Sequence, residues 1–458
     1  MKTKRKARPA PKKLLVLIII TALAFLSSLI PLEGLTPASK ISLMIFVAAA
    51  GLWITEVVPP FATAIFVIVI HIFVLGRPGG PLELDKTGYR IFLNPIASPV
   101  LVLFFGGFIL ALAAKKHNLD IRLAKAILSP FGKKPSMVLL GILITTALFS
   151  MFMSNTATTA MMIAIFGPLF KAHEKRTAFK KALVLAVPFA ANIGGMGTII
   201  GTPPNAVAAS VLEKLGIPIS FLQWMIIGVP IVILLLFILW MILLCCFKPR
   251  PQTFEILFEK PRPVSRDMII VLVTFIITVL LWLTEALHGI SASVVALFPV
   301  MIFTFLGVID RDDINRIEWN VLILVAGGLV SGVAMKKTGL SDVFVTQISI
   351  ISTSPKVILG IMVVSSLLIA NFMSHTSAAN LIIPLVASIT VISPKIGIIT
   401  IALTTSLAQS LPISTPPNAI AYSTRAITTK EMAIYGTALS VIGLFVMLGF
   451  LYLFRHLL

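Results

Sequence analysis

Four short motifs occur twice in this chain, in the same order in its first and second halves. They are a Trp-x-Thr-Glu motif, a Gly-Gly motif followed by two lysines, a Ser-x-Thr motif and a Thr-Pro-Pro-Asn-Ala motif. The four pairs stand at 53–56 and 282–285, 106–107 and 327–328, 154–156 and 374–376, and 202–206 and 415–419. An ordered set of repeats predicts two structural units of one design within a single chain.

The segments that carry these motifs are strongly apolar. Hydrophobic residues make up 58% of the 458-residue chain and charged residues only 12%. A soluble domain needs more charge than this on its surface, so the composition predicts an all-α polytopic membrane protein. Runs long enough to cross about 30 Å of hydrocarbon fall near 14–31, 41–58, 61–76, 97–114, 182–212, 221–247, 268–285, 290–308, 320–335, 397–424 and 432–454. The sequence therefore predicts about 11 transmembrane helices.

Two further apolar segments, 137–170 and 357–393, carry a Ser-x-Thr motif in the middle. Each is too long for one straight span and has no charged loop that would separate two. An unpaired hydroxyl or amide in hydrocarbon costs roughly 4–8 kcal/mol. Irregular backbone at that depth is tolerated only where it lines a cavity or is buried in protein. We therefore expect two re-entrant hairpins, each with its polar cluster at the tip.

The Thr-Pro-Pro-Asn motifs interrupt two otherwise apolar spans. Pro204 and Pro417 lack a backbone donor and clash with the preceding turn, so each span should break into two half-helices. The N-terminus of a half-helix favours an anionic group, and unwound carbonyls favour a cation. A proline kink used only for packing is the alternative explanation. Two breaks at equivalent places, each paired with a polar hairpin tip, favour a binding site.

The charge distribution predicts the orientation. The formal net charge is +20, but most of the 37 Lys and Arg residues stand in short loops that the positive-inside rule places in the cytoplasm. This predicts a multi-pass protein of the cell membrane with a cytoplasmic N-terminus, an external C-terminus and no nucleic-acid partner. The predicted parts are a basic tail with the first helix (1–40), a first repeat (41–250), a cytoplasmic linker (251–267) and a second repeat (268–458).

Each repeat contains five spans, an odd number, so the second must be inverted relative to the first. The first repeat would hold the hairpin 137–170 and the broken helix 182–212, and the second the hairpin 357–393 and the broken helix 397–424. Inverted repeats with paired interrupted helices are typical of secondary transporters that work by alternating access.

From about residue 41 onward, this set of motifs resembles the divalent anion/sodium symporter family. Members of that family transport dicarboxylates and citrate, and some transport sulfate. The resemblance implies a homodimer in which each protomer has a scaffold domain and an elevator-like transport domain made of the hairpins and broken helices. It also implies that Na⁺ is co-transported and that the anion lies between the two hairpin tips.

The resemblance further implies residue roles. A first sodium site would use Ser150, Ser154, Asn155 and a carbonyl at Gly201. The oxygens of hydroxyls, amides and carbonyls suit an alkali cation, and the donors of hydroxyls and amides suit a carboxylate. With no Lys or Arg expected in the pocket, dipoles and bound Na⁺ would hold a dianion. The residues expected to contact the substrate are Ser154, Asn155, Thr156, Thr202, Ser374, His375, Thr376, Thr415 and Pro416.

A second sodium site, at Met373, His375 and Ser414, departs from the family pattern. His375 stands where the family has an asparagine, and Ala370 stands where the first repeat has Ser150. A protonated His375 could take the role of the second cation, which would favour a sodium-independent exchanger. In the alternative, His375 bonds to the backbone and Na⁺ still binds through carbonyls.

The expected function is therefore secondary active transport of C4-dicarboxylates or citrate, coupled to sodium. Sodium-independent exchange and transport of sulfate or another oxyanion remain alternatives. An anion channel is a rival because re-entrant loops also build selectivity filters. An enzyme is not expected, because the sequence has no His-Glu-x-x-His, no Gly-x-Ser-x-Gly and no pair of intramembrane aspartates.

Overall fold

The structure is a computed structural model that describes residues 11–31, 34–172, 178–247, 263–351, 354–389 and 393–453. Every regular element within these ranges is a helix, which confirms the predicted all-α class. The first ten residues of the basic tail and most of the predicted linker 251–267 lie outside the described residues.

Helices of the first half run from α1 to α11. Their bounds are α1 Pro11–Ser27, α2 Pro37–Thr55, α3 Pro60–Ile70 with its continuation η1 His71–Leu75, α4 Arg90–Leu93, η2 Asn94–Ala97, α5 Pro99–Lys116, α6 Leu119–Leu128, η3 Ser129–Phe131, α7 Pro135–Ser150, α8 Asn155–Ala172, α9 Ala178–Gly195, α10 Pro203–Lys214 and α11 Phe221–Phe247.

Helices of the second half follow the same sequence of long elements. Their bounds are α12 Arg266–Leu283, α13 Glu285–His288, α14 Ala292–Val295, α15 Leu297–Phe305, α16 Arg311–Ile314, α17 Trp319–Lys337, α18 Leu340–Ile351, α19 Pro355–Phe372, α20 His375–Ala387, α21 Pro394–Ser406, α22 Pro416–Ser423 and α23 Thr429–Leu453.

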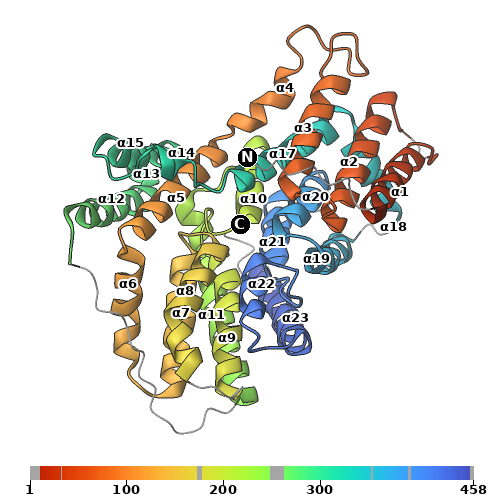
Figure 1. Ribbon diagram of the computed structural model, residues 1–458. Coiled ribbons are helices and arrows are strands. Elements are labelled where there is room, and N and C mark those ends of the chain that lie inside the picture. Colours follow the sequence, from red (N-terminus) through yellow and green to blue (C-terminus); the bar gives the residue numbers. More distant parts are fainter. Residues whose placement is uncertain are drawn as a thin grey trace.

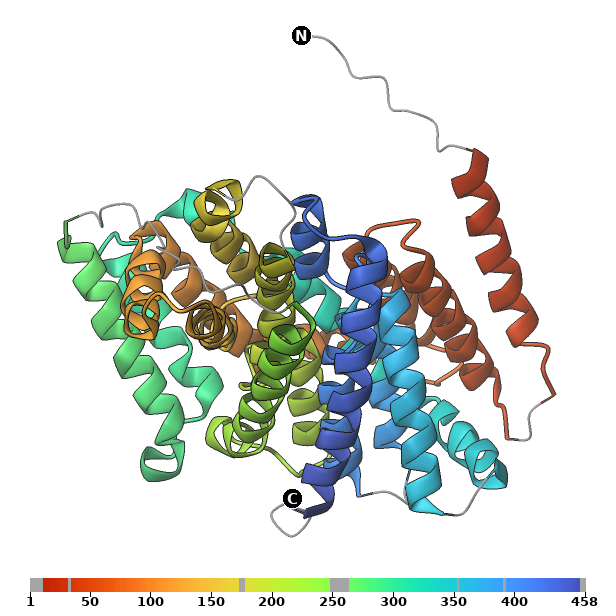
Figure 2. The same cartoon turned by 90° about the horizontal axis from the view of Figure 1, so that it is seen from below.

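Six helical stretches of the described chain are long and apolar enough to cross a membrane, and five shorter helical stretches are also apolar. The six are Pro37–Thr55, Arg90–Lys116, Phe221–Phe247, Arg266–Leu283, Trp319–Lys337 and Thr429–Gly449. Figure 2 shows many of the long helices of both halves running in similar directions, with α1 and α12 at opposite edges. Leu234, Phe237 and Phe445 are among the many large apolar side chains on the outer surface, as expected where lipid replaces water.

Both polar clusters lie where one helix ends and the next begins. Residues 151–154 connect α7 to α8, and residues 373–374 connect α19 to α20. Ser154 Oγ accepts a hydrogen bond from the Ala157 amide, and Ser374 Oγ accepts one from the Ser377 amide, both at 3.2 Å. Each serine therefore caps the second helix of its pair, because a short hydroxyl can satisfy an amide that has no intrahelical partner.

The Thr-Pro-Pro-Asn motifs lie at the end of each break. The prolines occupy the first two positions of α10 and of α22, where a missing backbone donor is harmless. Asn205 Nδ2 donates to the carbonyls of Gly195 (3.0 Å) and Thr198 (2.8 Å). Asn418 Nδ2 donates to the carbonyls of Gln409 and Leu411, both at 3.0 Å. The same side chain thus closes the same kind of loop in both halves.

The Trp-x-Thr-Glu motifs also have one structural role. Trp53 and Trp282 are fully buried, and their indole nitrogens donate to the carbonyls of Pro60 (3.1 Å) and Ala292 (2.9 Å). Each acceptor belongs to the first residue of the helix that follows, α3 or α14. The tryptophan therefore fixes the start of the next helix relative to the end of its own.

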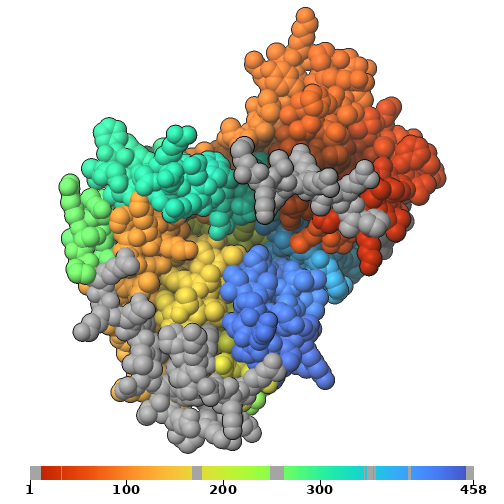
Figure 3. Space-filling model, viewed as in Figure 1, coloured from red at the N-terminus to blue at the C-terminus, as the bar shows by residue number. Residues whose placement is uncertain are grey.

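The two halves exchange helices in their packing. The half-helix α10 contacts α20 and α21 of the second half, whereas α22 contacts α8 and α9 of the first half. On the face shown in Figure 3, the segment containing α22 and α23 (blue) lies against the α7–α8 segment (yellow). Helix α5 contacts α14 and α15, and α17 contacts α3, so each half supplies elements that complete the other (Figure 1).

The Gly-Gly motifs permit these crossings. A Cβ atom on Gly106 would lie 2.1 Å from the Ala296 carbonyl oxygen, and one on Gly327 would lie 2.5 Å from the Ala64 Cβ. Both distances are shorter than any real contact between such atoms. The first glycine of each pair is therefore needed where the backbones of α5 and α17 approach a helix of the opposite half.

Asp120, at the start of α6, gives a test of the packing beside α5. Its side chain is 3% exposed, and burial raises the pKa of its carboxyl from 3.8 to about 6. Because this pKa is higher in the folded state than in the unfolded one, stability should fall as the pH rises from about 4 to 6. We expect Asp120→Asn to remove this fall and to stabilise the protein above pH 6 by up to ~3 kcal/mol.

The measurement is the thermal unfolding midpoint in detergent at several pH values. Asp342→Asn provides the control, because Asp342 stands near the start of α18 but is exposed. A midpoint for Asp120→Asn that equals that of the native chain at pH 8 would contradict the assignment of an unfavourable buried charge.

Candidate functional site

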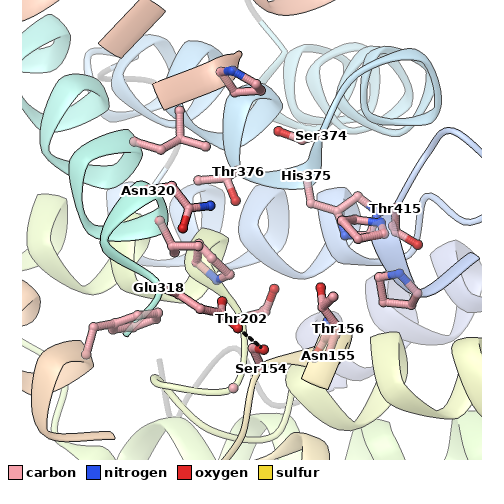
Figure 4. Close-up of a pocket in the computed structure, with 18 of the residues that line it drawn as sticks. Ser154, Asn155, Thr156, Thr202, Glu318, Asn320, Ser374, His375, Thr376 and Thr415 are labelled. Carbon is pink, nitrogen blue, oxygen red and sulfur yellow. Dashed lines mark hydrogen bonds between the residues drawn. The ribbon is translucent and has the colours of Figure 1, made fainter. Parts of the chain in front are cut away.

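A cavity of about 220 Å³ lies between the two hairpin tips and the two helix breaks. In Figure 4, Ser154, Asn155 and Thr156 lie on one side of it and Ser374, His375 and Thr376 on another. The cavity is lined by every residue that the sequence predicts to contact the substrate: Ser154, Asn155, Thr156, Thr202, Ser374, His375, Thr376, Thr415 and Pro416.

Four helix N-termini meet at this cavity. Asn155, Pro203, His375 and Pro416 are the first residues of α8, α10, α20 and α22, and all four line the wall. A helix N-terminus carries about half a positive charge and unpaired amides, so it attracts anions. Among the described residues of this wall there is no Lys or Arg, and Glu318 is the acidic one. Backbone dipoles and polar side chains therefore supply the favourable field for an anion.

Three of the four residues predicted for the first sodium site lie together. Ser150 is fully buried, and its Oγ donates to the Ala191 carbonyl at 2.7 Å. In the amide orientation that satisfies its neighbours, the Asn155 nitrogen donates to Ser150 Oγ (2.6 Å) and to the carbonyls of Gly201 and Ala191 (both 3.2 Å). Hydroxyl and carbonyl oxygens thus gather around the Asn155 amide behind the first tip, and a rotation of that amide would turn its oxygen toward a cation bound among them. The fourth residue, Ser154, instead donates to Glu318 Oε1 at 2.6 Å.

Two glycines allow the oxygen atoms to gather so closely. A Cβ atom on Gly195 would lie 2.6 Å from the side-chain amide of Asn155, and one on Gly201 would lie 2.4 Å from the Gly195 carbonyl oxygen. Any larger residue at either position would push these groups apart. The glycine run before the first break therefore serves this close approach of backbone to side chain.

The residues predicted for the second sodium site are arranged differently. His375 Nε2 lies 2.5 Å from the Ala408 carbonyl oxygen, so the nitrogen carries the proton and donates it. Ser414 Oγ donates to the Asn371 carbonyl at 2.9 Å. His375 and Ser414 line the cavity, whereas Met373 does not, and its side chain is buried. The backbone hydrogen bond of His375 is one of the two arrangements that the sequence left open.

Several residues of the wall were not identified from the sequence. Asn192 of α9 lines the cavity, and its Nδ2 donates to Gln409 Oε1 (3.3 Å) and Thr415 Oγ1 (3.4 Å) of the second half. An amide within the apolar segment 182–212 is the same kind of signal that marked the hairpin tips. Glu318 and Asn320 at the start of α17 and three aromatic side chains, Phe61, Phe104 and Phe108, also line the cavity and were missed.

Sequence comparisons match this chain to known transporters. The profile of the citrate transporter family matches residues 50–408. The sodium-dependent dicarboxylate transporter SdcS of Staphylococcus saprophyticus is 31% identical over an alignment that covers 96% of this chain and 91% of the relative. The protein of the same name from Staphylococcus aureus is 30% identical, with 95% of this chain and 89% of the relative covered.

A solved structure has the same general fold. The YdaH transporter of Alcanivorax borkumensis aligns with a TM-score of 0.56 over 86% of this chain and 97% of its own. The sequence identity is 14%, so this likeness concerns the fold alone. The profile match and the relatives go further: the chain is a multi-pass membrane transporter that belongs to the citrate transporter family and, with its sodium-dependent dicarboxylate relatives, to the divalent anion/sodium symporter family.

Proposed function

We propose that the protein is a sodium-coupled carrier of C4-dicarboxylates, such as succinate, malate or fumarate, or of citrate. The observation that carries this proposal is that four helix N-termini and two hydroxyl-rich tips meet at one cavity, whose wall has no Lys or Arg among the described residues. Two facing sets of donors suit an anion with a carboxylate at each end. The names of the relatives, sodium-dependent dicarboxylate transporters, support the same substrate class.

The substrate's carboxylates would bind at Asn155 and Thr156 of the first tip and Thr376 of the second, with Thr202, Thr415 and Pro416 beside them. Ser154, Ser374 and His375 would complete the wall. Na⁺ would bind behind the first tip among the oxygens of Ser150, Asn155 and Gly201, with Ser154 joining once its hydroxyl is released. Binding of the anion would then depend on bound Na⁺, and this dependence would couple the transport of the two ions.

The movement that we propose is of the elevator type. Eleven spans and two re-entrant hairpins would form two inverted repeats, 41–250 and 268–458. The hairpins and broken helices would move against a scaffold, and two protomers would form a homodimer in the cell membrane. The N-terminus would lie in the cytoplasm and the C-terminus outside. The exchange of helices between the halves supports a site shared by both repeats.

Sodium-independent exchange is the second candidate, and it requires a protonated His375 in the place of the second cation. The imidazole donates to the Ala408 carbonyl through Nε2, and a second proton on its other nitrogen would supply the charge that sodium would otherwise bring to Met373, His375 and Ser414. The remaining alternative concerns the substrate: the protein would carry sulfate or another oxyanion instead of a dicarboxylate. An anion channel is less well supported, because the site is built within one chain.

Uptake of labelled succinate into liposomes separates these functions. Purified protein is reconstituted, and uptake is followed under an inward Na⁺ gradient and a matched K⁺ gradient, with and without succinate inside. Sodium-dependent uptake into empty vesicles is the result expected for a coupled carrier. Uptake that needs internal succinate and ignores Na⁺ would identify an exchanger. No dicarboxylate or citrate uptake by folded protein, together with sulfate uptake, would overturn the substrate class.

His375→Asn tests the second site in the same assay. If His375 replaces a cation, asparagine frees the Ala408 carbonyl and restores the family's residue, so the variant should require more Na⁺ ions per anion. We expect the Hill coefficient for Na⁺ to rise and the half-saturating succinate concentration to depend more steeply on Na⁺. His288→Asn, a change at the last residue of α13 and outside the cavity wall, serves as the control. An unchanged sodium curve for His375→Asn would contradict the assignment.

A further inference from the structure

Glu318 is the acidic residue among the described residues of a cavity that is otherwise built to attract anions. It is the N-cap residue of α17 and is only partly exposed. Its Oε1 accepts a hydrogen bond from Ser154 Oγ at 2.6 Å, and this contact is drawn in Figure 4. A hydroxyl has a single proton to donate, and here that proton goes to Glu318. Ser154 cannot donate to a substrate carboxylate at the same time.

Helix α5 holds Glu318 in place. Lys116 of α5 forms ion pairs with Asp310 and Asp313, just before α17, and the Lys116–Asp310 distance is 3.1 Å. The rings of Phe105 and Trp319 lie 5.9 Å apart. These contacts hold the start of α17, which carries Glu318, against α5, whereas Ser154 belongs to the tip of the first hairpin. Their hydrogen bond joins two parts that the elevator movement would separate.

The same bond separates two cavities. A second cavity of about 120 Å³ adjoins the central one and shares Ser154, Glu318 and Phe108 with it. Lys115 and Arg316 line this second cavity. The first tip therefore stands between an anion site formed by helix dipoles and a smaller space with two cations. Breaking the Ser154–Glu318 bond would open the wall between them.

We propose that Glu318 is an internal competitor of the transported anion, which holds the Ser154 hydroxyl and the first hairpin tip in place until a substrate carboxylate takes that hydroxyl. An empty carrier is then latched to α17, and a loaded one is released. This inference rests on the proposed function. It adds a specificity and coupling role for a residue of the α5–α17 part of the molecule.

The test compares Glu318→Ala and Glu318→Gln with the native chain in reconstituted liposomes. A charge-assisted hydrogen bond that the substrate must replace lowers apparent affinity by about tenfold or more. Glu318→Ala should therefore lower the half-saturating succinate concentration by about tenfold. Glu318→Gln removes the charge but can still accept from Ser154, so we expect a decrease of about threefold. Glu213→Gln, which removes an exposed carboxylate outside the cavity wall, should change nothing.

A second readout distinguishes a latch from a residue that only supports the fold. Release of the empty carrier should raise the ratio of net uptake into empty vesicles to exchange into preloaded vesicles, more in Glu318→Ala than in Glu318→Gln. Without substrate, amide hydrogen exchange at 151–154 should be faster in Glu318→Ala than in the native chain. A half-saturating concentration that stays the same or rises, with an unchanged ratio and unchanged exchange, would overturn the latch.

Failure of the two proposals gives different results. If the native chain moves no dicarboxylate or citrate, the proposed function fails, and the hydrogen-exchange comparison still decides whether Glu318 restrains the tip. If the native chain transports succinate and both variants behave as it does, only the latch fails.

Discussion

A Gly201→Ala variant is expected to lose most of its sodium-dependent uptake while it remains folded. The added Cβ would lie 2.4 Å from the Gly195 carbonyl oxygen, so the backbone behind the first tip must shift. Overpacking of this kind costs about 1–3 kcal/mol. Because the displaced Gly201 carbonyl is one of the oxygens that gather around Asn155, we expect the half-saturating Na⁺ concentration to rise by about tenfold or more.

Two measurements check this expectation. The first is the Na⁺ dependence of labelled succinate uptake. The second is the rise of the unfolding midpoint with added NaCl compared with KCl, because an ion that binds only the folded state stabilises it. Gly167→Ala is the matched control, since a Cβ there meets no atom within 4 Å. Sodium curves for Gly201→Ala and the native chain that superimpose would refute a cation site behind the first tip.

Alanine at Asn205 or Asn418 should have the largest effect on folding. Each side chain is fully buried and donates to two backbone carbonyls that close a break. Leaving two buried carbonyls without donors costs about 2–6 kcal/mol. We expect both variants to unfold at lower temperatures and to lose transport, because the loops also carry Gly201 and Ser414. Aspartate at either position should lower the unfolding temperature as much as alanine does, since a carboxylate cannot donate to these carbonyls.

The similarity of the two effects is itself a prediction. The loops are built alike, so Asn205→Ala and Asn418→Ala should lower the unfolding midpoint in detergent by comparable amounts. Asn315→Ala, at an exposed position after α16, should leave the midpoint unchanged. An effect confined to one of the two variants would show that the equivalent hydrogen bonds differ in importance.

The sequence predicted the polar features of the molecule well, and the reason is physical. A hydroxyl or amide in hydrocarbon has a high free-energy cost, so Ser154–Thr156 and Ser374–Thr376 stood out against their apolar surroundings. Paired prolines in a span are similarly conspicuous. In the structure, the tips and the breaks lie around one cavity. The all-helical class followed from the same contrast between long apolar runs and short charged loops.

Other parts of the site carried no such signal. Phe61, Phe104 and Phe108 are ordinary residues of apolar helices, and only packing decides which of them faces the cavity rather than lipid. Glu318 precedes an apolar segment, where a charged residue is expected at a membrane boundary, so its position did not reveal its contact with Ser154. The sequence left two arrangements open for His375, and only three-dimensional placement brought its ring to the Ala408 carbonyl.

The exchanged half-helices have a consequence for how the protein is made. During synthesis, α10 leaves the ribosome long before α20 and α21, against which it packs, and α22 is among the last helices to appear. The first half therefore enters the membrane with an unfinished binding site, which the second half completes. The arrangement is that of two intertwined subunits joined into one polypeptide. Neither half alone supplies all four helix N-termini of the cavity wall, so one half by itself would present an incomplete site.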